Sequence, residues 1–308
     1  MFNFLAFLAS LLLVIKSANL SLRYSTQLAQ SLRISTHLVG FLVIAVISIL
    51  PEAFIAITSA IQDIPEFGLG TLFGSNVADL TLVFAIVTFF SFRGIKVKST
   101  LLKTATPYIG VMSIPLIFGL NGSYSRLEGA FLILLGICYY FMLLKKERRE
   151  LTMAQPRFSA KNTLFLLLSM AFLLLSAHLT VKYGIAIAQT LQVNPLLIGM
   201  FAVGLGTTLP ELCFSIKAVR NKADGLALGD ILGTVISDAT IVVGLVAVIA
   251  PFSFPPRLIY VTGAFMLTAT IFLFYLMRSN KELTRKEGLL LLAFYLCYVA
   301  VELLVSHG

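Results

Sequence analysis

Four acidic residues lie inside long apolar stretches of this 308-residue chain: Glu52, Asp79, Glu211 and Asp238. An ionised carboxylate among apolar groups is costly, so such residues usually face a partner or a cavity. Both glutamates directly follow a proline, and both aspartates lie five residues after a glycine. Four buried acids in two matched pairs indicate a cation site rather than four unrelated packing residues.

Neutral oxygens accompany each pair of acids. Proline has no N–H and clashes with the carbonyl four residues earlier, so we expect carbonyls freed at 45–48 and 204–207. The hydroxyls of Ser75 and Thr234 lie four residues before the aspartates, on the same helical face. Ca²⁺ takes about six to eight oxygens in flexible geometry, whereas Mg²⁺ demands a stricter octahedron. The sequence therefore predicts broken helices that form a hard-oxygen cation site near the middle of a membrane.

The composition is that of an integral membrane protein. Hydrophobic residues make up 58% of the chain and charged residues 12%, whereas a soluble domain carries about 25% charge. The net charge of +9 is dispersed over short connections, which does not favour nucleic-acid binding. Apolar runs near the spanning length of about 20 residues predict an all-α protein. The ten predicted transmembrane helices lie near 2–30, 35–62, 68–92, 102–121, 126–145, 161–190, 195–220, 225–250, 256–277 and 286–305.

The two halves of the chain resemble each other. One constant shift in numbering, the repeat shift, aligns 32–52 with 191–211 without a gap and also places Asp79 on Asp238. Because five spans is an odd number, the second copy must enter the membrane from the opposite side, which makes an inverted repeat. The predicted units are a first five-helix repeat 1–146 (ion motif 45–79), a basic linker 147–160 and a second five-helix repeat 161–308 (ion motif 204–238).

Basic residues predict the orientation. With both termini outside, 20 of the 23 lysines and arginines fall on the cytoplasmic side, and only Arg126, Lys182 and Arg257 fall outside. Nine or eleven spans would scramble this asymmetry. We therefore expect a multi-pass protein of the cell membrane with its N- and C-termini outside and the 147–160 linker in the cytoplasm.

At the acidic motifs the chain resembles the membrane domain of sodium/calcium exchangers, in the cation/calcium antiporter superfamily. The second repeat reads GTTLPE at 206–211 and the first repeat ISILPE at 47–52. GSNVAD at 74–79 is a close match to the family's second motif, and GTVISD at 233–238 is a weaker one. The resemblance covers both halves. It implies ten helices with both termini outside, and a central Ca²⁺ site that the two glutamates share, flanked by Na⁺ sites.

Carried over residue by residue, the resemblance implies a set of ion ligands. They are Glu52, Glu211, Asp79, Asp238, Ser48, Thr207, Ser75, Thr234, Ala45, Gly204 and Thr208. Two departures stand out: Ile49 replaces a usual hydroxyl, and Asp79 stands where many sodium/calcium exchangers have asparagine. Extra carboxylates resist simultaneous ionisation, so such a site could also exchange protons.

The predicted function is a secondary antiporter that exchanges Ca²⁺ for Na⁺ by alternating access, with H⁺/Ca²⁺ exchange as the alternative. A cation channel is a candidate of another class, but an inverted repeat with a midplane site favours alternating access. No Ser–His or HExxH arrangement predicts an enzyme. We expect no cofactor, and a protein that works as a monomer in the lipid bilayer. The sequence is equally consistent with two roles for Asp230, a charge at a helix terminus or a group in the vestibule that leads to the site.

Overall fold

A computed structural model describes residues 2–31, 49–91, 93–147 and 160–306. These residues are almost entirely helical, as the composition predicts. Within these described ranges, seven helices are long and apolar enough to cross a bilayer. Three shorter apolar helices, Phe2–Ser17, Leu50–Ile61 and Ala105–Asn121, lie within three further predicted spans.

The helices divide between the two halves of the chain. The first half contains α1 (Phe2–Ser31), α4 (Leu50–Ile61), α5 (Pro65–Ala78), α6 (Phe84–Phe90), α7 (Ser99–Leu102), α8 (Ala105–Phe118) and α9 (Arg126–Glu147). The second half contains α10 (Ala160–Leu191), α11 (Pro195–Leu197), α12 (Gly204–Thr207), α13 (Leu209–Arg220), α14 (Asp224–Ser237), α15 (Val243–Ile249), α16 (Ala264–Asn280) and α17 (Arg285–Ser306).

Wider turns interrupt several of these spans. They are the π-helices η2 (Asp79–Val83), η4 (Ile198–Val203), η5 (Asp238–Val242) and η6 (Ile259–Gly263). A tighter turn, the short 3₁₀-helix η3 (Gly119–Asn121), follows α8. A π-turn closes its hydrogen bond over one more residue than an α-turn, and such turns are frequent at functional sites. Two of the four begin at the predicted site residues Asp79 and Asp238.

The repeat shift found in the sequence recurs in the element bounds. It carries the first residue of α4 onto the first residue of α13, that of α5 onto that of α14, and that of α9 onto that of α17. The π-helices η2 and η5 are related by the same shift. Equivalent segments of the two halves therefore fold into equivalent elements.

In the part of the chain that the structure describes, four two-residue strands depart from the all-α expectation. Strand β1 (Ile95–Lys96) pairs antiparallel with β4 (Glu282–Leu283), and β2 (Ser123–Tyr124) pairs antiparallel with β3 (Phe252–Ser253). Each strand lies in a connection between helices, where backbone groups have no helical partner. Pairing two connections satisfies those groups and ties together loops that are distant in sequence.

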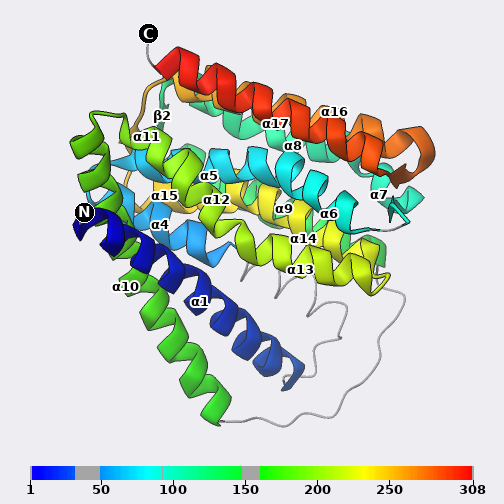
Figure 1. Ribbon diagram of the computed structural model, residues 1–308, viewed down its shortest axis with the longest axis horizontal. Coiled ribbons are helices and arrows are strands. Elements are labelled where there is room, and N and C mark those ends of the chain that lie inside the picture. The colour runs from blue at the N-terminus through cyan, green and yellow to red at the C-terminus, as the bar shows by residue number, and fades with distance from the viewer. Residues whose placement is uncertain (1, 32–48, 92, 148–159, 307–308) are drawn as a thin grey trace.

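The helices lie in a bundle with one pair set apart from it. In Figure 1, α1 and α10 lie side by side and run diagonally away from the other helices, while α16 and α17 cover the opposite side of the bundle. The segments Pro65–Phe90 and Asp224–Ile249 form its centre, because 83% of each apolar window is buried, compared with 28% for Arg126–Leu143. These central segments carry Asp79 and Asp238.

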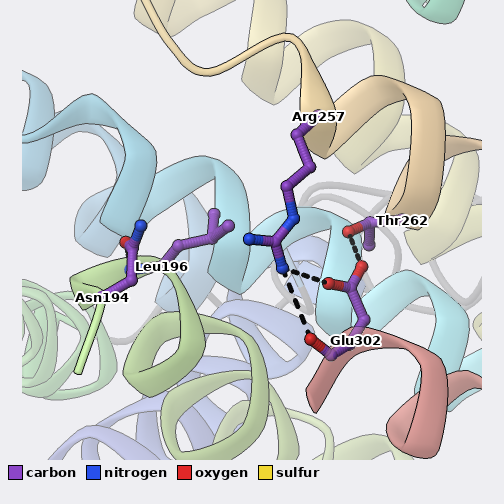
Figure 2. A network of polar contacts seen from close by, with 5 residues as sticks. All are labelled: Asn194, Leu196, Arg257, Thr262 and Glu302. Carbon is purple, nitrogen blue, oxygen red and sulfur yellow. Dashed lines mark hydrogen bonds and ion pairs between the residues drawn. The ribbon is translucent and has the colours of Figure 1, made fainter. Parts of the chain in front are cut away.

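A polar network fixes one end of α17 (Figure 2). The carboxylate of Glu302 accepts a hydrogen bond from Thr262 and forms an ion pair with Arg257 at 3.5 Å. In the same view, the side chain of Asn194 caps α11 by accepting the backbone N–H of Leu196 at 2.9 Å. Glu302 is thus a buried acid with partners, and it serves to hold α17 against η6.

Candidate ion-binding site

The four predicted acids occupy the starts of four helical segments. Glu52 lies in the first turn of α4 and Glu211 in the first turn of α13. Asp79 is the first residue of η2, and Asp238 is the first residue of η5. All four side chains are buried, with at most 2% of the residue exposed. Each helix therefore directs its acid into the protein interior.

The structure places Glu52 and Asp79 within electrostatic range of each other and of the two other acids. Glu52 interacts with Asp79, Glu211 and Asp238, and Asp79 interacts with Glu211 and Asp238. Residues that are far apart in sequence, and that come from both halves of the chain, thus form one acidic cluster. Like charges in a medium of low dielectric constant repel each other strongly, so a bound cation would relieve that repulsion.

Five carboxylate oxygens of this cluster have no hydrogen-bond partner among the described residues. They are Glu52 Oε2, Asp79 Oδ1, Glu211 Oε2 and both Oδ atoms of Asp238. Buried carboxylate oxygens are normally hydrogen-bonded, because an unpaired one forfeits its hydration without compensation. Oxygens left in this way have lone pairs that a metal cation can accept.

The nearby hydroxyl groups form hydrogen bonds with backbone carbonyls. Ser75 donates to the carbonyl of Leu72 at 3.0 Å. The Thr207 hydroxyl lies 3.1 Å from the carbonyl of Gly204 and also hydrogen-bonds the Glu52 side chain. Thr208 donates to the carbonyl of Leu205 at 3.0 Å. A hydroxyl that donates its proton elsewhere keeps its lone pairs for a cation. Thr234 Oγ1 is buried and has no hydrogen-bond partner within the described part of the chain.

The second-repeat helix is interrupted at one residue, Thr208, just before its proline, while the backbone of Thr208 stays in the helical region. Helix α12 ends at Thr207 and α13 begins at Leu209, with proline in its first turn. The Gly204 carbonyl accepts both the Thr207 hydroxyl and the Thr208 N–H, so any cation at that oxygen would share it with these donors. Ala45 and Ser48, the predicted counterparts in the first repeat, lie outside the described residues.

The acids alone do not make a complete metal site. Within the described ranges, no three Asp, Glu, His or Cys side chains form a group that could hold a metal ion. A cation bound here would therefore need the neutral hydroxyl and carbonyl oxygens as well.

Close helix packing positions the Ser75 segment against the second repeat. A Cβ built on Gly74 would stand 2.6 Å from the carbonyl oxygen of Met200, and one built on Gly204 would stand 3.1 Å from the backbone nitrogen of Ser75. The backbones of the two segments therefore approach each other closely at Gly74. It allows Ser75 to lie beside the broken helix that carries Thr207.

Three buried polar residues lie beside the cluster. The sequence did not predict two of them as site residues, and for the third, Asp230, it allowed two roles. Asp230, in the middle of α14, interacts electrostatically with Asp79 and Glu211, which favours a vestibule group over a helix-terminus charge. Tyr108 and Tyr140 interact electrostatically with Asp238. An aspartate in an apolar helix is a signal that sequence can reveal. The tyrosines carry no such signal, because their positions depend on the packing of α8 and α9.

Comparison with known proteins identifies the family. The family model for sodium/calcium exchanger proteins matches residues 2–145 and 161–304, which is nearly the whole chain. The chain belongs to the sodium/calcium exchanger family. Members of this family are transporters rather than enzymes, and the apolar helices of this member make it an integral membrane protein.

Two relatives match this chain over nearly their whole length. CaxA of Alkalimonas amylolytica is 30% identical over 94% of this chain and 95% of its own. The sodium/calcium exchanger MaX1 of Methanosarcina acetivorans is 25% identical over 97% of this chain and 98% of its own. A solved structure of the sodium-calcium exchanger NCX_Mj has the same fold, with a TM-score of 0.69 and 23% identity over 97% of this chain and 98% of that one.

Proposed function

We propose that this exchanger moves Ca²⁺ in exchange for Na⁺, by alternating access at a site formed by Glu52, Asp79, Glu211 and Asp238. The observation that carries the proposal is a set of five carboxylate oxygens that have no hydrogen-bond partner among the described residues. They belong to four buried acids, and Glu52 and Asp79 interact with each other and with both of the others. The hydroxyls of Ser75 and Thr208 donate to carbonyls, and Thr207 bonds both Gly204 and Glu52, so the lone pairs of these hydroxyls can complete an oxygen shell. Ala45, Ser48 and Gly204 would add further ligands.

The proposed architecture is ten transmembrane helices in two inverted five-helix repeats, 1–146 and 161–308. Support comes from the short strands as well as from the helices. Strands β1 and β4 lie in two connections that the basic residues predict to be cytoplasmic, and β2 and β3 lie in two predicted to be outside. The repeat shift carries β2 onto β4, so the repeat relates a pair on one face to a pair on the other. The proposed orientation in the cell membrane has both termini outside and the 147–160 linker in the cytoplasm.

Two observations keep H⁺/Ca²⁺ exchange as the second candidate. Asp79 adds a carboxylate to the cluster, and protons compete with metal ions for clustered carboxylates. Ile49 is buried among apolar side chains, whereas its repeat equivalent Thr208 offers a hydroxyl oxygen. The first repeat therefore has one neutral oxygen fewer for Na⁺. Neither ion makes a cofactor necessary, and each repeat-related pair of ligands comes from one chain, which fits a functional monomer.

The test is Ca²⁺ uptake into proteoliposomes, with Na⁺ and pH gradients imposed separately. We expect an outward Na⁺ gradient to drive Ca²⁺ uptake at equal pH on both sides. Uptake that a pH gradient drives in the complete absence of Na⁺, and that Na⁺ does not increase, would identify proton exchange instead. Ca²⁺ flux that needs no counter-ion at all would indicate a channel.

A further inference from the structure

Two buried tyrosines hold the helix that presents Thr234 and Asp238. Tyr108 on α8 donates its hydroxyl to the carbonyl of Leu232 at 2.8 Å. Tyr140 on α9 donates to the carbonyl of Gly233 at 2.8 Å and also contacts the Ser237 hydroxyl. Both tyrosines are at most 7% exposed. Side chains from two helices of the first half of the chain are thus hydrogen-bonded to the end of α14 in the second half.

These contacts hold one face of α14 and leave the next face to the ion site. Gly233 and Ser237 lie four residues apart, hence on one face of the helix. Thr234 and Asp238 are each one residue further on, about 100° around the axis. With Gly233 and Ser237 held by Tyr140, the helix is fixed in rotation at the point where α14 passes into η5.

The oxygens on the neighbouring face are the ones that lack partners. Thr234 Oγ1 and both Oδ atoms of Asp238 have no hydrogen-bond partner among the described residues, although both residues are at most 1% exposed. The Ser237 hydroxyl, which is next to Asp238 in the chain, is engaged by Tyr140. The tyrosines therefore fix this turn without using any of the oxygens that a cation needs.

The first repeat lacks this support. The repeat shift carries Tyr108 onto Leu267 and Tyr140 onto Val299, neither of which has a hydroxyl group. The other end of α14 is also held, since Asp224 accepts the Arg93 side chain at 2.7 Å and the Lys96 N–H at 2.9 Å. Its repeat equivalent is a proline, Pro65, which carries no charge.

We propose that Tyr108 and Tyr140 are positioning residues that hold the Thr234–Asp238 turn as the preformed half of the Ca²⁺ site. The repeat-related turn Ser75–Asp79 has no tyrosine at either equivalent position, so this hydroxyl support belongs to the second-repeat half of the site alone. The proposal rests on the proposed function, because it assigns these residues to the same site. Groups that orient metal ligands from behind typically change metal affinity about 10–100-fold when they are removed.

The experiment uses Tyr108→Phe and Tyr140→Phe, which keep the ring and remove only the hydroxyl. Tyr124→Phe is the matched control, because Tyr124 is fully buried and donates to the carbonyl of Pro115 at the same distance of 2.8 Å. It lies at the β2 strand, outside the acidic cluster. Each purified protein is titrated with Ca²⁺ in detergent by calorimetry and assayed for Ca²⁺ uptake in proteoliposomes.

We expect each of the two variants to raise the half-saturating Ca²⁺ concentration about tenfold while the maximal rate changes less than about twofold. Tyr124→Phe should leave the half-saturating concentration unchanged. If Tyr140→Phe yields little folded protein, Ser237→Ala removes one of its partners and should shift Ca²⁺ binding in the same direction.

Unchanged Ca²⁺ binding in both variants, or an equal shift in the Tyr124→Phe control, would overturn the positioning role while leaving the proposed function intact. A wild-type protein that neither binds nor carries Ca²⁺ would overturn the proposed function and this inference with it. The titration of the wild-type protein therefore separates the two failures.

Discussion

Gly74 lies at a tight crossing between α5 and η4, and its replacement by alanine tests how closely the two repeats must approach. An added Cβ would stand 2.6 Å from the carbonyl oxygen of Met200 and 2.8 Å from its Cα. Ordinary van der Waals contact begins at 3.4 Å, so the two backbones would have to separate by about 0.8 Å. Because the obstructing atoms include backbone, no side-chain rotation relieves the clash. Overpacking of this kind costs about 1–3 kcal/mol of folding free energy.

The shift should also weaken Ca²⁺ binding, since Gly74 immediately precedes Ser75 and the same helix leads to Asp79. We expect Gly74→Ala to lower the thermal unfolding midpoint in detergent and to raise the half-saturating Ca²⁺ concentration. Far-UV circular dichroism can follow unfolding, because the chain has no tryptophan to serve as an intrinsic fluorescent probe.

Gly110→Ala on α8 is the matched control for this substitution. A Cβ at Gly110 meets nothing within 4 Å, and alanine is favoured over glycine inside a helix by about 1 kcal/mol. The control should therefore be as stable as the wild-type protein or more stable. If Gly74→Ala is equally stable and binds Ca²⁺ normally, the crossing is looser than the structure indicates and the reasoning is refuted.

Three further predictions concern the acids and the topology. Glu211→Gln and Glu52→Gln should each abolish Ca²⁺ uptake in proteoliposomes while the protein still elutes as a folded species; wild-type uptake in either would remove that glutamate from the site. Ca²⁺ uptake should slow as the pH falls, because protons compete for the clustered carboxylates. Asp79→Asn should weaken this inhibition, because it removes one carboxylate that binds protons. An unchanged pH profile would show that Asp79 does not contribute to the inhibition. Single cysteines placed in the 147–160 linker of a cysteine-free variant should resist an impermeant thiol reagent in intact cells, whereas labelling there would reverse the proposed orientation.

The sequence by itself determined the helical membrane class, the register of the repeat and the identity of the four acids. Each of these is a local property. Apolar runs of spanning length define helices wherever they pack, and a constant shift that aligns two Pro–Glu pairs does not depend on structure. Glu52 and Glu211 stand out because carboxylates are rare in such runs. The helix break at Thr208 was predictable for the same reason, since proline acts on its own preceding turn.

Only the tertiary structure decided which atoms face one another. The hydroxyl of Tyr140 meets the carbonyl of Gly233, which lies 93 residues further along the chain, and no local pattern distinguishes this tyrosine from its neighbour Tyr139. The π-turn at Asp238 adds a single residue to one turn, a change too small to alter the periodicity of an apolar span. The interaction of Glu52 with Asp238 likewise joins the two halves of the chain. Such contacts depend on how whole helices pack, because burial and distance belong to the assembled bundle and not to any single segment.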